Sequence, residues 1–344
     1  MKKVRFGVVG TNFITDWVIA GAREDVRFEL AAVCSRTCER GEEFARKHGI
    51  PHVFTSLEEM TAGDTVDAVY IATPNCMHAR QSIYCMSRGK HVLCEKPMAS
   101  NAAEARAMIG ASQRFGVTLM EAMKSTLSPN FRAVSESLRR VGRVRRYFAS
   151  FCQYSSRYDK FKEGTVLNAF RPELSNGAIM DIGVYAIYPA VVLFGAPRSI
   201  EAQGVLLSSG ADGQGAVNML YDGMNATVLY SKIADSLLPS EIEGEHGNIL
   251  VDRIQTPTDV RFYARTAPAS GRGARPKPEQ LSVASAYDEY YYEIAEFIDL
   301  VLAGEVSSRV NSHAASLAVM EIVDEVRRQI GVHYPADDNP MLEM

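Results

Sequence analysis

One lysine stands where a buried strand is expected to end. The run His91-Val92-Leu93-Cys94-Glu95 is followed directly by Lys96 and Pro97. An ammonium group at the end of a strand can hold a hydroxyl or carbonyl oxygen and assist the movement of its proton. Glu95 could hold or tune that charge. The alternative is that Glu95 and Lys96 form an ordinary salt bridge on the surface.

The first turn of the chain has the position of a dinucleotide-binding turn. The segment Gly7-Val8-Val9-Gly10-Thr11-Asn12-Phe13-Ile14-Thr15 joins a predicted strand to a predicted helix. In the pattern G-x-G-x-x-G/A, glycines allow a tight turn and let a pyrophosphate rest on the helix N-terminus. Only Gly10 matches. Asn12 replaces the second glycine and is expected to tolerate left-handed backbone, and Thr15 replaces the third. Residues 10–14 are candidate cofactor contacts, and an ordinary strand–turn–helix corner is the alternative.

The end of the second predicted strand indicates which dinucleotide would bind. The strand ends Val33-Cys34-Ser35-Arg36-Thr37 and lacks the carboxylate that accepts from the ribose of NAD. The planar, charged fork of an arginine suits a 2′-phosphate. Ser35 and Arg36 therefore favour NADP(H), with NAD(H) still possible. The alternative is that Ser35 caps the next helix and Arg36 is a surface residue.

A third polar turn follows the apolar run 68–72. It reads Ala72-Thr73-Pro74-Asn75, with His78 shortly after it. Open α/β sheets bind ligands beyond the carboxyl ends of their strands. The turn is therefore expected to contact the nicotinamide half of the cofactor, and a plain turn with a helix cap is the alternative.

These turns need a sheet whose strands end at one edge. Strands are predicted at 4–9, 28–34, 53–54, 68–72, 91–95 and 118–121, and helical segments such as 15–23 and 38–48 lie between them. Strands that alternate with helices predict βαβ units and a parallel sheet. Residues 1–124 are therefore expected to form a doubly wound Rossmann domain.

The second half of the chain has a different pattern. Strands are predicted at 143–153, 200–207, 215–220 and 226–231, with a hairpin at 241–251, a loop at 267–278, and helices at 130–140, 288–303 and 312–330. Closely spaced strands with short turns predict an antiparallel sheet. Residues 125–344 are therefore expected to form an α+β domain with a mostly antiparallel sheet. Its C-terminal helix is expected to pack back on the first domain.

Composition narrows the class of protein. The chain has 344 residues and a net charge of -4, which argues against nucleic acid as a partner. Six cysteines without a C-x-x-C pair, and the absence of a signal-like N-terminus, indicate free thiols in the cytoplasm. The seven histidines lack metal-ligand spacing, so no metal site is expected. The chain also lacks the ~18 consecutive apolar residues of a membrane span.

Four motifs together resemble a known family. Gly7-Val8-Val9-Gly10, Ala72-Thr73-Pro74-Asn75, Glu95-Lys96-Pro97 and Asp181-Ile182-Gly183-Val184-Tyr185 are similar, in this order, to the Gfo/Idh/MocA oxidoreductases. The resemblance covers essentially the whole chain. It implies a Rossmann domain and a second domain for substrate and oligomerisation over residues 125–344, whose sheet is large and open. It also implies hydride transfer between nicotinamide and a carbinol or carbonyl carbon.

The residue at position 185 suggests a branch of that family. Many members carry histidine there, whereas Tyr185 resembles the branch of glucose–fructose oxidoreductase and dimeric dihydrodiol dehydrogenase, which tends to use NADP(H). The resemblance implies that Tyr185 is the acid/base and that Lys96 lowers its pKa, because a nearby ammonium stabilises phenolate. Asp181, four residues earlier, would share its helix face and orient the substrate or the pair. Arg171 is expected to bind substrate or cofactor.

The sequence therefore predicts an NADP(H)-preferring oxidoreductase of a sugar, polyol or related carbonyl compound, forming a homodimer or homotetramer through the C-terminal sheet. Two alternatives stay open. One is an enzyme that retains its cofactor and shuttles hydride between sugars. The other is a redox sensor that binds NADP(H) without turnover, against which the intact Lys96 and Tyr185 count.

Overall fold

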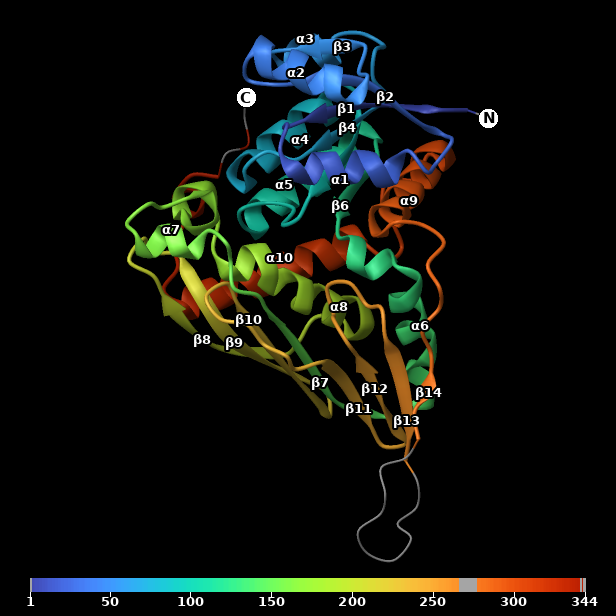
Figure 1. The fold of residues 1–344 in the computed structure, drawn as a ribbon, viewed down its shortest axis with the longest axis vertical. Coiled ribbons are helices and arrows are strands. Elements are labelled where there is room, and N and C mark those ends of the chain that lie inside the picture. The colour runs from blue at the N-terminus through green and yellow to red at the C-terminus, as the bar shows by residue number, and fades with distance from the viewer. Residues whose placement is uncertain (1, 266–276, 341, 343–344) are drawn as a thin grey trace, which may run out of the picture.

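The protein consists of two β-sheets with a long helix between them. The structure, a computed structural model, describes residues 2–265, 277–340 and 342. Helix α10 (His313–Ile330) crosses between the sheets (Figure 1). The loop predicted at 267–278 lies almost wholly outside the described residues, so it stays a prediction. The domain boundary at 124/125 also stays a prediction.

The first sheet has six parallel strands in the order β3-β2-β1-β4-β5-β6. They are β1 (Val4–Val9), β2 (Phe28–Cys34), β3 (His52–Phe54), β4 (Ala68–Ile71), β5 (His91–Glu95) and β6 (Leu119–Ala122). Every residue of β4 and β6 is buried, because helices cover both faces of the sheet. The predicted Rossmann sheet is confirmed.

Helices from distant parts of the chain cover this sheet. The N-terminal ones are α1 (Phe13–Ala22), α2 (Cys38–His48), α3 (Leu57–Thr61), α4 (His78–Ser87) and α5 (Ala102–Phe115). Helix α9 (Glu289–Ala303) joins α1 on one face (Figure 1). There the ring of Phe297 lies 5.7 Å from that of Phe6, at a tilted angle. Side chains of α4 and α5 pack on the opposite face. The core of the first sheet therefore includes residues from near the end of the chain.

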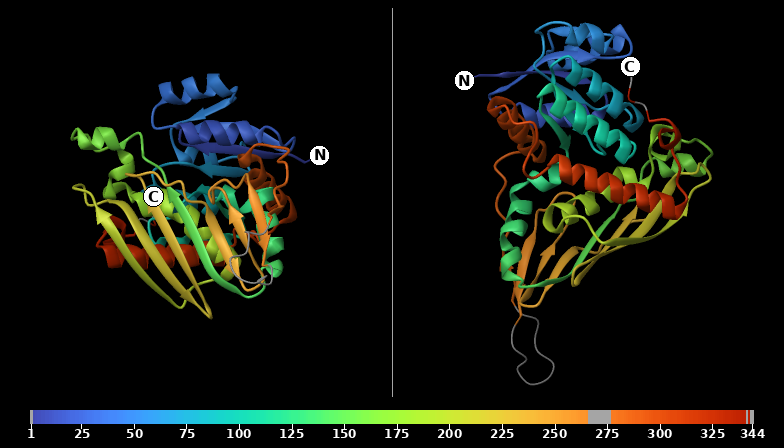
Figure 2. Two further views of the ribbon diagram at one scale, coloured as in Figure 1. Left: turned by 60° about the horizontal axis from the view of Figure 1, so that its bottom comes forward. Right: turned by 180° about the vertical axis from the view of Figure 1, so that it is seen from behind.

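The second sheet has eight strands in the order β14-β13-β12-β11-β7-β10-β9-β8. They are β7 (Val144–Cys152), β8 (Ser199–Leu206), β9 (Asp212–Tyr221), β10 (Met224–Ser231), β11 (Ser240–Gly244), β12 (Gly247–Val251), β13 (Val260–Ala264) and β14 (Glu279–Gln280). Only β7 and β10 pair in parallel, so the prediction of a mostly antiparallel sheet is confirmed. None of the described helices crosses its outer face (Figure 2).

The other helices lie around the inner face of the second sheet. They are α6 (Pro129–Ser137), α7 (Tyr158–Lys162), α8 (Val184–Phe194) and α11 (Pro335–Asp338). By length and composition alone, the stretch 172–194 that contains α8 could cross a membrane, but 72% of its most apolar window is buried inside the protein. Burial against the sheet therefore accounts for its apolar character. All six cysteines are free thiols.

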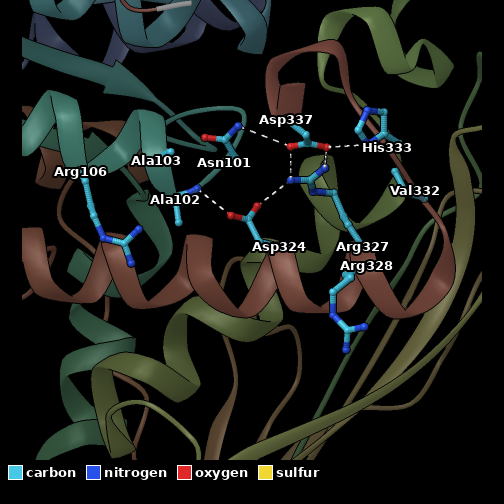
Figure 3. Close-up of a pocket in the computed structure, with 10 residues that line it drawn as sticks. All are labelled: Asn101, Ala102, Ala103, Arg106, Asp324, Arg327, Arg328, Val332, His333 and Asp337. Carbon is cyan, nitrogen blue, oxygen red and sulfur yellow. Dashed lines mark hydrogen bonds and ion pairs between the residues drawn. The ribbon is translucent and has the colours of Figure 1, made fainter. Parts of the chain in front are cut away.

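One buried arginine ties the end of the chain to the first domain. Arg327 of α10 is 3% exposed, and its guanidinium donates to Asp337 at 2.7 Å and to Asp324 at 2.6 Å (Figure 3). Beside it, the Asn101 side chain donates to the carbonyl of Ala336 at 2.9 Å. These groups line a cavity of about 410 Å³ between α5, α10 and the C-terminal segment. The network fixes the C-terminal segment against the start of α5.

Replacing Arg327 with methionine is expected to lower the free energy of unfolding by about 3 kcal/mol, since removing one partner of a buried ion pair leaves the others uncompensated. Urea unfolding would measure the loss. Arg328→Met is the matched control, because the Arg328 side chain is 70% exposed and, among the described residues, forms an ion pair only with Glu325. Its expected cost is below ~1 kcal/mol. Equal losses in the two variants would contradict a special role for Arg327.

Candidate active site

The turns after β1, β4 and β5, which carry predicted site residues, lie at one edge of the first sheet. Strands β1, β4 and β5 run parallel and in register, so Gly10, Thr73 and Lys96 follow their carboxyl ends side by side. This is the edge at which an open α/β sheet binds its ligand.

Hydrogen bonds from side chains fix the turn after β1, at the positions where the pattern would have glycines. Gly10 has φ +105°, and an added Cβ would lie 2.5 Å from the Ala72 carbonyl oxygen, so only glycine fits. Asn12 caps α1, accepts from the Ile14 amide at 2.9 Å, and donates to the carbonyl of Ala72 at 2.8 Å. The hydroxyl of Thr15 donates to the carbonyl of Gly10 at 2.9 Å.

This geometry corrects one prediction about the turn. Asn12 has extended backbone, with φ −97°, and the left-handed position belongs to Gly10. The physical reason is that an N-cap residue must be extended for its side chain to reach the amides of the first helical turn. Thr11 lies just before the N-cap, and Phe13 and Ile14 open α1. The Ile14 amide is already bonded to the Asn12 side chain, so a pyrophosphate would rest on the other amides at this helix N-terminus.

The end of β2 carries an arginine, Arg36, that has no partner among the described residues. The hydroxyl of Thr37, and not that of Ser35, caps α2 by accepting from the Arg40 amide, so the alternative reading of Ser35 is wrong. Ser35 is buried beside β3, where its amide donates to the carbonyl of Phe54. Arg36 is exposed and has no hydrogen bond or ion pair to any residue that the structure describes. The guanidinium of Arg36 and the hydroxyl of Ser35 are hydrogen-bond donors that fit a 2′-phosphate.

The turn after β4 is tied to its surroundings through side chains. His78 is 1% exposed, and its two ring nitrogens each lie 2.9 Å from a carbonyl oxygen, those of Pro97 and Thr73. The amide group of Asn75 donates to the carbonyl of Ser175 at 2.8 Å. His78 can therefore influence a ligand only through the two turns that it joins, and Asn75 links the turn to the second domain.

Lys96 meets the second domain at Asp181. Its ammonium donates to the Asp181 carbonyl at 2.9 Å and to Oδ1 at 3.1 Å, and it lies 4.9 Å from the centre of the Tyr185 ring. A single π-helical turn over 179–183 leads into α8 and carries Asp181 and Tyr185 to this point. Lys96 thus forms one cluster with two residues that lie 85 or more positions later in the chain.

A second lysine, which the sequence reasoning did not select, completes the cluster. The ammonium of Lys232, directly after β10, binds Oδ2 of Asp181. Burial pushes the pKa of Asp181 up, but Lys232 and Lys96 outweigh burial and hold that pKa well below its usual range. Asp181 is therefore an anion that anchors two cations. Its low pKa makes it unsuitable as a proton donor near neutral pH.

The structure corrects the expected effect on Tyr185. Burial raises its pKa well above the ordinary value, and the negative charges of Glu95 and Glu293 add to the rise. The ammonium of Lys96 lies 4.9 Å from the ring centre and hydrogen-bonds Asp181, and it does not reverse this rise in the pKa of Tyr185. The phenol is therefore protonated at neutral pH and suited to donate a proton.

Buried carboxyl groups hold the loop that carries Lys96. Glu95 accepts from the hydroxyl of Tyr70 at 2.6 Å and from the backbone amide of Lys96 at 3.2 Å, and burial raises its pKa. Glu121 accepts from the amide of Met98 at 2.9 Å, and burial raises its pKa to about 7. Glu95 therefore holds the backbone of Lys96, while Asp181 holds its ammonium.

Arg171 lies apart from this cluster. Its half-exposed side chain pairs with Glu173 at 3.6 Å. Its neighbour Phe170 is buried instead, with its ring 5.4 Å from the ammonium of Lys232. The structure thus brings Lys96, Asp181, Tyr185 and Lys232 together, and places Arg171 outside them. Among the described residues, no group of three His, Cys, Asp or Glu side chains could hold a metal ion.

Comparisons with known proteins agree with this arrangement. Residues 4–123 match the model of the oxidoreductase family with an NAD-binding Rossmann fold, and residues 132–250 match the GFO/IDH/MocA C-terminal domain. The chain is 49% identical over 334 residues to scyllo-inositol 2-dehydrogenase (NADP(+)) IolU of Bacillus subtilis, covering 97% of this chain and 99% of that protein.

More distant relatives share the fold. Trans-1,2-dihydrobenzene-1,2-diol dehydrogenase of Danio rerio is 33% identical over 320 residues, covering 90% of this chain and 91% of that protein. The solved structure of levoglucosan dehydrogenase with NADH and levoglucosan superposes with a TM-score of 0.83 at 20% identity, covering 96% and 98% of the two chains. The predicted family and the predicted enzyme class are confirmed. The chain belongs to the Gfo/Idh/MocA family of oxidoreductases.

Proposed function

We propose that this oxidoreductase interconverts a cyclic polyol and its ketone with NADP(H), and that oxidation of scyllo-inositol at one carbinol is its first candidate reaction. The observation that carries the proposal is the Lys96–Asp181–Tyr185 cluster at the sheet edge. Its support from relatives is the likeness to the NADP(+)-linked inositol dehydrogenase, which spans nearly all of both chains.

Each side chain of the cluster has a role in this reaction. A bound nicotinamide would accept or supply the hydride. The ammonium of Lys96 would donate to the substrate oxygen and stabilise the negative charge that develops there. Tyr185 would exchange the proton of that oxygen. Asp181 would hold Lys96 in place and accept from a neighbouring hydroxyl, for which its 32% exposed side chain leaves room.

The direct test is an absorbance assay of the purified chain with scyllo-inositol, myo-inositol and glucose, each with NADP⁺ and with NAD⁺. We expect turnover of an inositol with NADP⁺. Tight NADPH binding without turnover of any polyol or ketone would favour the redox sensor. Cofactor that copurifies and never exchanges during turnover would favour the hydride-shuttling enzyme.

Replacing Arg36 with alanine is expected to weaken NADPH binding about 10- to 100-fold, the scale of a lost charged hydrogen bond, and to leave NADH binding nearly unchanged. Fluorescence titration with both cofactors would measure this. Arg46→Ala is the matched control, since Arg46 is an exposed arginine in the last turn of α2, away from the end of β2. An equal loss for NADPH and NADH would contradict a contact between Arg36 and the 2′-phosphate.

We also propose that copies of the chain associate through the outer face of the second sheet, as a homodimer or homotetramer. Val205 and Leu220 are about half exposed in neighbouring strands of that sheet, without cover from any described helix. Free thiols at all six cysteines fit a reducing compartment, and we propose the cytoplasm.

A further inference from the structure

Lys232 is a buried cation whose charge is directed at the proposed active site. Its side chain is 3% exposed, and its ammonium binds Oδ2 of Asp181 while Lys96 holds Oδ1. Its backbone is fixed on both sides, because its amide donates to the Gly213 carbonyl and its carbonyl accepts from the Ser155 amide. The ring of Phe170 lies 5.4 Å from the ammonium. Its position is therefore set by three separate segments of the second domain.

Counted over Lys96, Lys232 and Asp181, the two lysines exceed the single carboxylate by one positive charge. A single lysine paired with Asp181 would be largely neutralised by it, because an ion pair with little water around it cancels most of its field. Because Lys232 binds one carboxylate oxygen of Asp181, only part of the negative charge of Asp181 is left to neutralise Lys96 at the other oxygen. More of the Lys96 charge then remains for an oxygen that becomes negative during hydride transfer.

We propose that Lys232 is a positioning residue for the reaction, which acts by balancing the charge of Asp181 so that Lys96 can stabilise the substrate oxygen. This inference rests on the proposed function of Lys96 and Asp181. It assigns no contact between Lys232 and substrate.

The test is a double-mutant cycle on kcat of polyol oxidation. Lys232→Met is expected to lower kcat about 10- to 100-fold, less than the loss of a donor that touches the reacting oxygen. In the Asp181→Asn background the same replacement is expected to change kcat by no more than about twofold, because the charge that Lys232 balances is gone. Unchanged kcat in the single variant, or the same fall in both backgrounds, would overturn the proposal.

Two further variants separate this role from a purely structural one. Lys232→Arg keeps the charge and Lys232→Gln removes it at similar size, so kcat of the arginine variant is expected to be about 10-fold higher or more. Equal kcat in these two variants, each shown by circular dichroism to be folded and by NADPH titration to bind cofactor, would overturn the proposal even if Lys232→Met fails to fold. Failure of the wild-type chain to turn over any polyol or ketone would instead refute the proposed function, whereas retained turnover in Tyr185→Phe would remove only the proton-transfer role of that residue.

Discussion

Replacing Tyr185 with phenylalanine is expected to lower turnover about 10²- to 10⁴-fold, which is the usual loss when an acid–base group is removed. NADPH binding should stay nearly unchanged, because the change removes one oxygen and keeps the ring that packs near Lys96. Steady-state kinetics and fluorescence titration on the same preparations would measure both. Turnover within about tenfold of the wild type would exclude Tyr185 from proton transfer.

The pH dependence gives a second readout of the same group. The pKa of Tyr185 is raised, so the neutral phenol predominates through neutral pH and the proton-accepting phenolate forms only at alkaline pH. Polyol oxidation needs the acceptor form, so its kcat is expected to rise with pH, while ketone reduction needs the neutral form and should fall at high pH. Both trends should vanish in Tyr185→Phe. Tyr188→Phe is the control, since that hydroxyl lies one turn along α8 and bonds Ser316 instead.

Replacing Lys96 with methionine is expected to lower kcat about 10²- to 10³-fold, the scale found when a donor to a developing oxyanion is removed. The fold should survive, because Asp181 keeps Lys232 as a partner and is not left as an unpaired buried charge. Steady-state kinetics with circular dichroism would check both expectations.

A second strand-end lysine is the matched control for Lys96. Lys124 follows β6, its side chain is 11% exposed against 13% for Lys96, and it also pairs with a carboxylate, that of Glu289. Lys124→Met is expected to lower kcat less than tenfold. A comparable loss in both variants would show that any buried lysine at this edge matters, and would remove the specific role of Lys96.

Local patterns were sufficient to predict most of the fold. Strand β4 is a short apolar run between turn residues, and such runs identify strands that are buried on both faces. The alternation of strands and helices up to β6 then required a parallel sheet. The hairpin of β11 and β12 was likewise readable from its glycine turn. These features depend on residues close together in the sequence.

The details of the site depended on residues far apart in the sequence. The Asn12 side chain is fixed by a carbonyl 60 positions away, and Lys232 meets Asp181 across 51 positions. A lysine directly after a strand was the only signal for Lys232, and it is common on surfaces. The pKa of Tyr185 is raised by burial first, and then by Glu95 of β5 and Glu293 of α9. Electrostatics of this kind requires the packed structure.

The position of α9 also has a consequence for folding while the chain is being synthesised. This helix covers the face of the first sheet that carries Phe6 and Val8, yet it is encoded after residue 288. On the ribosome, the nucleotide-binding half therefore emerges with one apolar face covered by the N-terminal helices alone, until almost the whole chain has been synthesised. Until α9 has been synthesised and packs there, the exposed apolar residues of that face can cause aggregation. Chaperones would also recognise them.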